Sequence, residues 1–153
     1  MQYGSIEAKV KSAPVGGIVT AFIWMAPGGD EIDYEWVGTE AQSAYYYHGI
    51  PDYSTEGSKI VSDDSSAFHI YRIDWSADSM VWSVDGQAVR TVTKDSTLKN
   101  GTYHYPTEAS NVQFGVWDAS ENPSTAAWAH GPVNWSIEGP SISSFIEYIT
   151  VSC

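Results

Sequence analysis

The sequence contains little that could cross-link the chain, cross a bilayer or attract nucleic acid. Its single cysteine, Cys153, leaves no partner for an internal disulfide. Only 7 Lys and Arg residues stand against 19 Asp and Glu, which argues against the basic stripe that a nucleic-acid binder needs. No apolar run approaches the length of a membrane span, and the start, MQYGSIEAKV, lacks the features of a signal peptide. The acidic balance favours a neutral or cationic ligand.

The pattern that is present is period-two alternation of apolar and polar residues, with almost no helical periodicity. Asp85-Gly86 lies between two alternating runs and predicts a tight hairpin. Regular short strands separated by turns indicate an all-β sandwich, and the chain length suits one domain, residues 1–153. Strands are expected at residues 6–10, 18–25, 31–36, 44–48, 68–75, 80–84, 88–92, 111–117 and 145–151, and surface loops at 62–67 and 121–127.

The most informative stretch is the acidic one at residues 28–38, GGDEIDYEWVG. On a strand, Glu31, Asp33 and Glu35 project to one face, while the apolar residues between them project to the other. Positions i and i+4 place two Cα atoms ~13 Å apart, and converging side chains can reduce the carboxyl separation to the ~5–5.5 Å typical of retaining glycosidases. Crowded carboxylates also raise the pKa of at least one member, which favours a protonated general acid.

Spacing alone leaves other interpretations of this stretch open. Alternating acids usually mark a solvated outer face, and carboxylates are also the oxygen ligands of calcium sites. The four histidines, at positions 48, 69, 104 and 130, show no spacing typical of a zinc site. On spacing alone, the catalytic interpretation of this stretch is therefore no better supported than a solvated outer face.

Several further blocks accompany the Glu-x-Asp-x-Glu signature in a fixed order. YGSIEAKVK and GGIVTAFIWM precede it, and FHIYRIDWSADSMVWSVDGQAVRTV, FGVW and TAAWAHG follow it. With these blocks the sequence resembles glycoside hydrolase family 16, and most of all the fungal Crh branch of chitin–glucan transglycosylases in the cell wall. The resemblance extends over nearly the whole chain, so it is far more specific than a five-residue motif.

The resemblance implies a concanavalin-like β-jelly-roll of two antiparallel sheets with a concave glycan cleft, lacking N-terminal strands that family members usually have. It implies a retaining mechanism in which Glu31 is the nucleophile, Asp33 assists it and Glu35 is the acid/base that also contacts substrate. It further implies a polysaccharide substrate (chitin and β-glucan), no metal or other cofactor, and an extracellular, cell-wall location. An endo-β-glucanase and a non-catalytic glycan-binding sandwich are the alternative functions.

Candidate sugar contacts come partly from the resemblance and partly from position. The resemblance implies glycan contacts for Gln113, Trp117 and Thr125. Trp24, on the strand before the acidic one, is a candidate floor of the cleft, and Trp128 is a candidate for its rim, together with Trp135. Because core packing is the more frequent role of a Trp in a β-sandwich, that alternative stays open for each of them.

Overall fold

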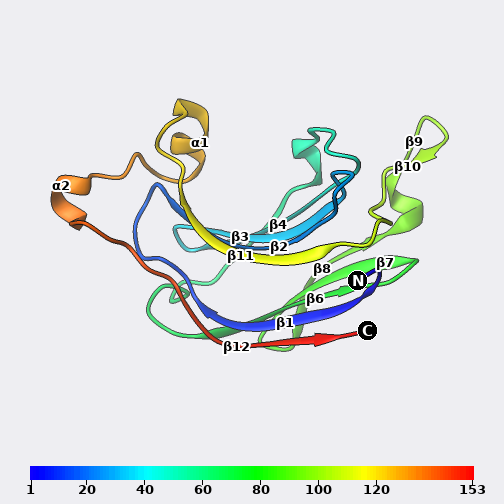
Figure 1. Ribbon diagram of the computed structural model, residues 1–153, viewed down its shortest axis with the longest axis horizontal. Coiled ribbons are helices and arrows are strands. Elements are labelled where there is room, and N and C mark those ends of the chain that lie inside the picture. Colours follow the sequence, from blue (N-terminus) through cyan, green and yellow to red (C-terminus); the bar gives the residue numbers. More distant parts are fainter.

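The computed structural model covers residues 1–153 and shows two stacked antiparallel sheets (Figure 1). This confirms the expected all-β sandwich. The lower sheet in Figure 1 has the order β12-β1-β6-β7-β8, with β1 (Gly4–Lys11), β6 (His69–Trp75), β7 (Ser79–Val84), β8 (Gln87–Thr93) and β12 (Phe145–Ser152). The upper sheet has the order β11-β2-β3-β4-β5, with β2 (Ile18–Met25), β3 (Glu31–Val37), β4 (Glu40–Tyr46), β5 (Gly57–Ile60) and β11 (Asn111–Asp118).

Short elements connect these strands, and some of them differ from the sequence-based expectation. They are η1 (Tyr53–Thr55), η2 (Lys94–Thr97), β9 (Leu98–Lys99), β10 (Thr102–Tyr103), α1 (Pro123–Trp128) and α2 (Trp135–Glu138). The prediction of a loop at 121–127 was wrong over α1. Asn122 caps this helix by accepting a hydrogen bond from the Ser124 backbone N–H at 2.9 Å, and Pro123 occupies its first turn. The strand expected at 44–48 instead spans Glu40–Tyr46.

The core lies between the sheets and consists largely of aromatic rings. The even-numbered residues of β2 and β3 supply the buried Phe22, Trp24, Ile32, Tyr34 and Trp36. They meet Tyr71, Ile73, Trp75 and Trp82 of the opposite sheet. Edge-on packing, such as that between the Trp36 and Tyr71 rings with centroids 4.6 Å apart, is a favoured geometry for aromatic pairs. This packing fixes which face of β3 points away from the core.

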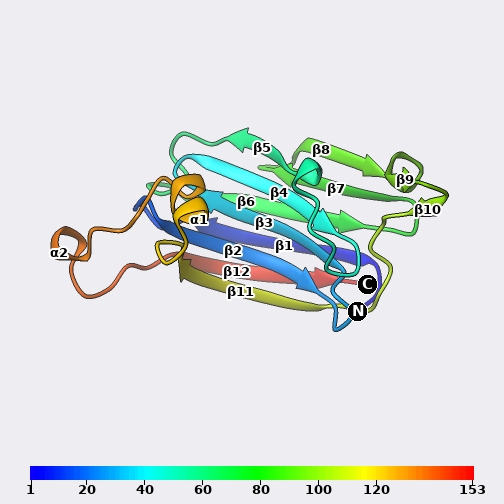
Figure 2. The same ribbon diagram turned by 90° about the horizontal axis from the view of Figure 1, so that it is seen from above.

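The outer face of the upper sheet is concave. Helix α1 stands at one end of this face, and η1 stands toward the other end (Figure 1). Figure 2 looks onto the face and shows β11, β2, β3 and β4 running side by side beneath these elements. The arrangement matches the jelly-roll with a concave face that the resemblance implied.

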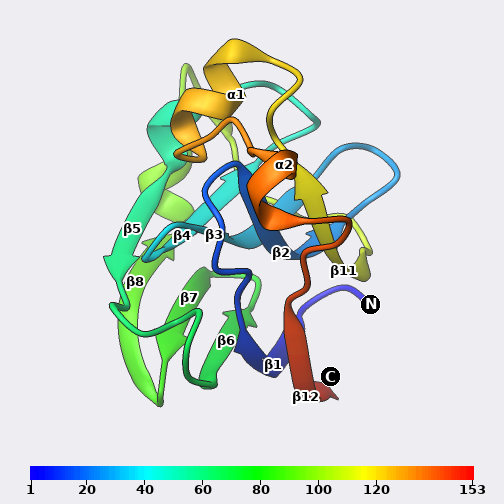
Figure 3. The ribbon, with the colours of Figure 1, turned by 90° about the vertical axis from the view of Figure 1, so that its left-hand side faces the viewer.

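One side of the sandwich is open. The edge strands β11 and β12 lie on the same side of the molecule, opposite β5 and β8 (Figure 3). Along β12, Ile149 and Val151 pair with the buried Ala8 and Ile6 and therefore face the interior, yet they remain 45% and 49% exposed. The apolar interior thus reaches the surface along this edge.

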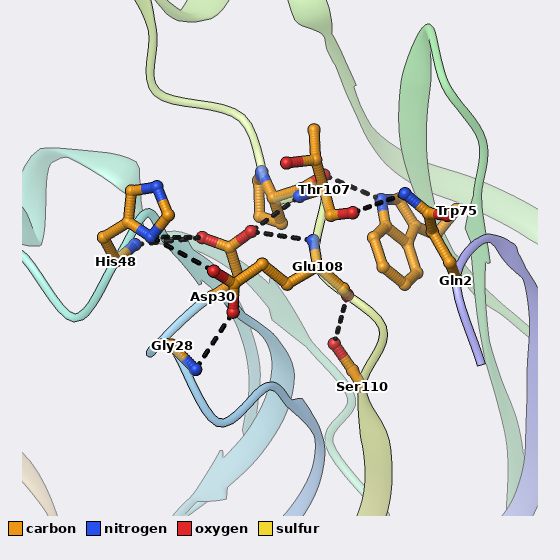
Figure 4. Close-up of polar contacts among 9 residues, drawn as sticks. Gln2, Gly28, Asp30, His48, Trp75, Thr107, Glu108 and Ser110 are labelled. Atoms are coloured by element: carbon orange, nitrogen blue, oxygen red, sulfur yellow. Dashed lines mark hydrogen bonds and ion pairs between the residues drawn. The ribbon is translucent and has the colours of Figure 1, made fainter.

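A buried carboxylate ties together three loops at one end of the concave face (Figure 4). Asp30, which has no exposed surface, accepts hydrogen bonds from the backbone N–H groups of His48 (2.9 Å), Thr107 (2.6 Å) and Glu108 (3.0 Å). The Glu108 carboxylate in turn accepts from the Gly28 N–H at 2.9 Å. These bonds fix the start of β3 relative to the segments that follow β4 and precede β11.

We expect Asp30→Ala to lower the free energy of unfolding by about 3–5 kcal/mol, because three backbone donors lose their acceptor. Asp30→Asn, which keeps one acceptor oxygen, should cost about half as much. Urea unfolding measures both changes, with Asp78→Ala as the control, since the exposed Asp78 side chain makes no hydrogen bond in the structure. A loss below about 1 kcal/mol in Asp30→Ala would contradict this role.

Candidate active site

Strand β3 is flanked on both sides by regular antiparallel pairing. Its pairing with β2 and β4 shows no bulge, so the alternation of its side chains is uninterrupted. Glu31, Asp33 and Glu35 therefore share the concave face, as expected from the sequence, while Ile32, Tyr34 and Trp36 are buried on the other side. Their partners on the concave face are Met25, Ile23 and Ala21 of β2 and Tyr46, Ala44 and Gln42 of β4.

Asp33 is the most deeply placed of the three acids. Its side chain is 2% exposed, and its Oδ1 accepts a hydrogen bond from the Ala44 N–H at 2.9 Å. Its backbone carbonyl accepts another from Trp82 Nε1 at 2.8 Å, which joins β3 to the opposite sheet. Burial first, and then the charges of Glu35 and Glu31, hold the pKa of Asp33 well above its usual range.

The two glutamates are less buried, and their environments differ. Burial, followed by the negative charge of Glu31, raises the pKa of Glu35 to about 7, although a hydrogen bond with Trp117 lowers it somewhat. Burial also raises the pKa of Glu31, but its hydrogen bond with Asp33 opposes this shift. The Glu35 carboxyl group, with a pKa near neutrality, therefore lies on the same strand face as that of Glu31, whose upward pKa shift a hydrogen bond opposes, and this difference suits paired acid and nucleophile roles.

An aromatic platform lies beside Glu35, where β11 meets α1. Trp117 is 37% exposed, and its ring stacks on that of Trp128 with centroids 6.1 Å apart and planes inclined by 24°. Trp128 Nε1 donates to Gln42 Oε1 at 2.8 Å, and this bond links α1 to the concave face of β4. Gly115 of β11 pairs with Ala21 of β2, which in turn pairs with Glu35 of β3, so the three residues lie in one row across the sheet. No atom lies close to the position that a Cβ of Gly115 would take, which leaves room for a ligand ring.

The structure brings the other candidates together to different degrees. Gln113 is exposed on β11 and pairs with Ile23, so it lies in the same row as Asp33. Thr125 lines a surface depression with Trp117, although its hydroxyl already donates to the carbonyls of Ala119 and Asn122. Trp135 is exposed on α2, and its Nε1 donates to Asp118 at 3.0 Å.

The prediction that Trp24 forms the cleft floor was wrong. Trp24 pairs with Ile32 and therefore faces the core, where it is 0% exposed. It packs edge-on against Trp75 with ring centroids 5.0 Å apart. A residue of even number on β2 cannot reach the concave face, because side chains alternate along a strand.

Three residues at the site were not singled out from the sequence: Gln42, Tyr46 and Glu56. Gln42 holds Trp128, and Tyr46 pairs with Glu31. Burial, followed by the negative charges of Asp33, Glu56, Glu31 and Glu35, raises the pKa of the Tyr46 hydroxyl. Glu56, which follows η1, also raises the pKa of Glu35. Only the register of β4 against β3 could have revealed Gln42 and Tyr46.

Comparison with known proteins places this chain in a family. The model for glycosyl hydrolases family 16 matches residues 1–139. The chain belongs to glycosyl hydrolase family 16. Within this family of glycosidases and transglycosylases it is 42% identical to Crh-like protein 2 of Aspergillus fumigatus, over 99% of the chain and 37% of that protein. It is 40% identical to Crh-like protein UTR2 of Candida albicans, over 89% of the chain and 31% of that protein.

Among solved structures, this family 16 chain superposes on the Crh5 transglycosylase in complex with NAG with a TM-score of 0.91 and 28% identity, over 99% of the chain and 64% of the other. The β-glucanase of Bacillus licheniformis shares the fold with a TM-score of 0.79 and 24% identity, over 99% and 66%. The chain spans about a third of the length of these curated relatives. None of its helices is long and apolar enough to cross a bilayer.

The causes of the Glu35 pKa shift predict two opposite substitution effects. Glu56→Gln removes a nearby negative charge and should lower the pKa of Glu35, whereas Trp117→Phe removes a hydrogen bond to the carboxylate and should raise it. Each change should be at most about one unit. Carboxyl carbon-13 NMR titration of Glu35 in the folded variants measures both, and shifts of the same sign would contradict the assignment.

Proposed function

We propose that this chain forms the catalytic core of a retaining glycosidase and transglycosylase that cleaves chitin and transfers it to β-glucan in the fungal cell wall. The observation that carries the proposal is the pairing of Glu31 and Glu35 on one face of β3, with the pKa of Glu35 near 7. The similarity to Crh-like proteins and to a transglycosylase solved with NAG, the sugar unit of chitin, favours this substrate class.

In the first step, protonated Glu35 gives its proton to the glycosidic oxygen while the Glu31 carboxylate attacks the anomeric carbon. The bond to the leaving chain breaks, that chain departs with a new hydroxyl, and a glycosyl ester of Glu31 forms. In the second step, the Glu35 carboxylate takes the proton of an acceptor hydroxyl as its oxygen attacks the same carbon. Glu31 is released, and Glu35 regains its proton.

Asp33 assists by holding a proton beside the nucleophile. Two carboxyl groups can share a hydrogen bond only if one of them is protonated. Asp33 is the more buried of the pair and the one whose pKa is raised further, so it supplies the proton that bonds Glu31. The bond orients Glu31 and stabilises it as the leaving group of the second step.

The choice between water and sugar as acceptor depends on the surface beside the acids. The stacked rings of Trp117 and Trp128, with the exposed Gln113 on the same strand, offer a platform that positions a sugar better than bulk water. The mechanism draws its proton and its nucleophile from side chains alone. A cell-wall polysaccharide as substrate also implies an extracellular location.

Incubation with a chitin donor and a fluorescent β-glucan oligosaccharide acceptor tests the proposal. Transfer predicts labelled polymer that grows with time. A shortened donor without label, or cleavage of β-glucan alone, would indicate a hydrolase such as an endo-β-glucanase. Binding to glycan without either product would indicate a non-catalytic sandwich.

We expect Glu31→Gln to reduce turnover at least ~10³-fold, because no glycosyl ester can form on a neutral amide. Glycan binding should stay within about threefold, since the platform residues are unchanged. Product analysis and isothermal titration calorimetry measure the two effects. Glu147→Gln, on β12 of the other sheet, is the control and should behave as wild type. Substantial turnover by Glu31→Gln would exclude Glu31 as the nucleophile.

A further inference from the structure

Arg90 is a half-buried cation without a carboxylate partner. It lies on β8 of the lower sheet and extends between the sheets to β4 and η1. Its guanidinium lies 4.8 Å from the centroid of the Trp82 ring and 5.8 Å from that of Tyr45, and no ion pair reaches it. Such a placement costs solvation free energy, so its bonds to the upper sheet merit a functional explanation.

The bonds of Arg90 end on backbone and side-chain oxygens next to the acidic site. Nη1 donates to the Ser43 carbonyl at 2.5 Å and to Ser43 Oγ at 3.0 Å, and Nη2 donates to the Thr55 carbonyl. At Gly57, an added Cβ would come within 3.1 Å of Arg90 Cδ, so a side chain there would crowd the path of the arginine. The arginine therefore joins β8 to the β4 side of the candidate active site.

One peptide unit connects this cation to the central acid. The Ser43 carbonyl that accepts from Arg90 belongs to the same peptide as the Ala44 N–H, which donates to Asp33 Oδ1 at 2.9 Å. Charge at the oxygen end of a peptide polarises it, so that its N–H becomes a stronger donor. The Trp82 ring that stacks under the guanidinium also donates through Nε1 to the Asp33 carbonyl at 2.8 Å.

We infer that Arg90 is a positioning residue which acts from the core side of the sheet, through the Ser43–Ala44 peptide, to orient the Asp33 carboxyl group and to weaken its hold on the proton that it shares with Glu31. The inference deepens the proposed function, because it assigns to the opposite sheet a part in setting the charge of the acidic site. The direction of the coupling agrees with the titration behaviour of Arg90: burial lowers the pKa of its guanidinium, and the charges of Tyr45 and Asp33 offset this.

Burial and the neighbouring glutamates raise the pKa of Asp33, and the hydrogen bond from the Ala44 backbone N–H, whose peptide Arg90 contacts, lowers it. Glu31 and Glu35 act from β3, and the Tyr46 hydroxyl lies on β4. Glu56 acts on Glu35 and Tyr46 from the segment after η1. All of these groups are acidic, and Arg90 on β8 is the cation that faces Asp33 through the sheet.

The test is the ionisation of Asp33 itself, followed by carboxyl carbon-13 NMR titration in the full chain. We expect Arg90→Gln and Arg90→Met to raise the pKa of Asp33 by about one unit, a tenfold change in its protonation equilibrium. Arg90→Lys, which keeps the charge but not the two-pronged donor, should restore at least half of the difference. Arg72→Met is the matched control. Arg72 lies on the same lower sheet as Arg90 but pairs with Asp74 and Glu7 of that sheet, so this variant should leave the pKa of Asp33 unchanged.

This readout needs no turnover, so its result is independent of whether the chain is a transglycosylase. Asp33 pKa values within about 0.3 unit of wild type, a twofold change in the protonation equilibrium, in folded neutral variants would overturn the inference. Failure of both neutral variants to fold would overturn it as well, since Arg90 would then have a structural role only.

Discussion

The structure depends on the two-sided character of β3. Ile32, Tyr34 and Trp36 bury one face of this strand in an aromatic core, and the same backbone presents three acids on the other face. Carboxylates this close repel one another, and only a strand fixed on both sides by regular pairing can keep them together. Burial of the three apolar side chains, worth ~1.5–3 kcal/mol each, offsets this repulsion. The core therefore creates the site as well as the fold.

A gradient of burial along that strand separates the pKa values of the three acids. Asp33 is the deepest, and its pKa is raised the furthest; Glu35 is intermediate, and Glu31 is held closer to its ionised form by a hydrogen bond. In the proposed mechanism, three carboxyl groups thus act as proton holder, general acid and nucleophile because their burial, neighbouring charges and hydrogen bonds differ. The contribution from behind the sheet, by Trp82 and Arg90, fits this scheme because both reach β3 and β4 without entering the concave face.

The sequence could predict features that depend on the alternation of side chains along one strand. It could predict little that depends on the register in which neighbouring strands pair. Alternation placed Glu31, Asp33 and Glu35 on one face and predicted the sandwich, both of which the structure confirms. Alternation could also have excluded Trp24 from the cleft, because Trp24 and the buried Phe22 are two residues apart on β2 and so face the same side. The prediction instead relied on the closeness of Trp24 to the acidic strand in the sequence. Gln42 and Tyr46 escaped notice because their relation to Glu35 and Glu31 arises only from the β3–β4 pairing. Helix α1 was missed because it is six residues long and depends on the Asn122 cap.

The position of each residue in the sheet suggests which part of the site is held more firmly against local loosening of the sheet. The acids lie on a central strand with hydrogen-bonded neighbours on both sides, whereas Gln113 and Trp117 lie on β11, which pairs with β2 alone. The platform is secured mainly by stacking of Trp117 on Trp128 and by the bond from Trp128 to Gln42, which runs back across the face to β4. Loosening of the open β11 edge would disturb the sugar platform before it disturbed the acids. In the proposed enzyme, bond cleavage therefore depends on the central strand β3, and the choice of acceptor depends on the edge strand β11. The choice of acceptor is thus the more sensitive of the two to any segment or partner that covers the β11 edge.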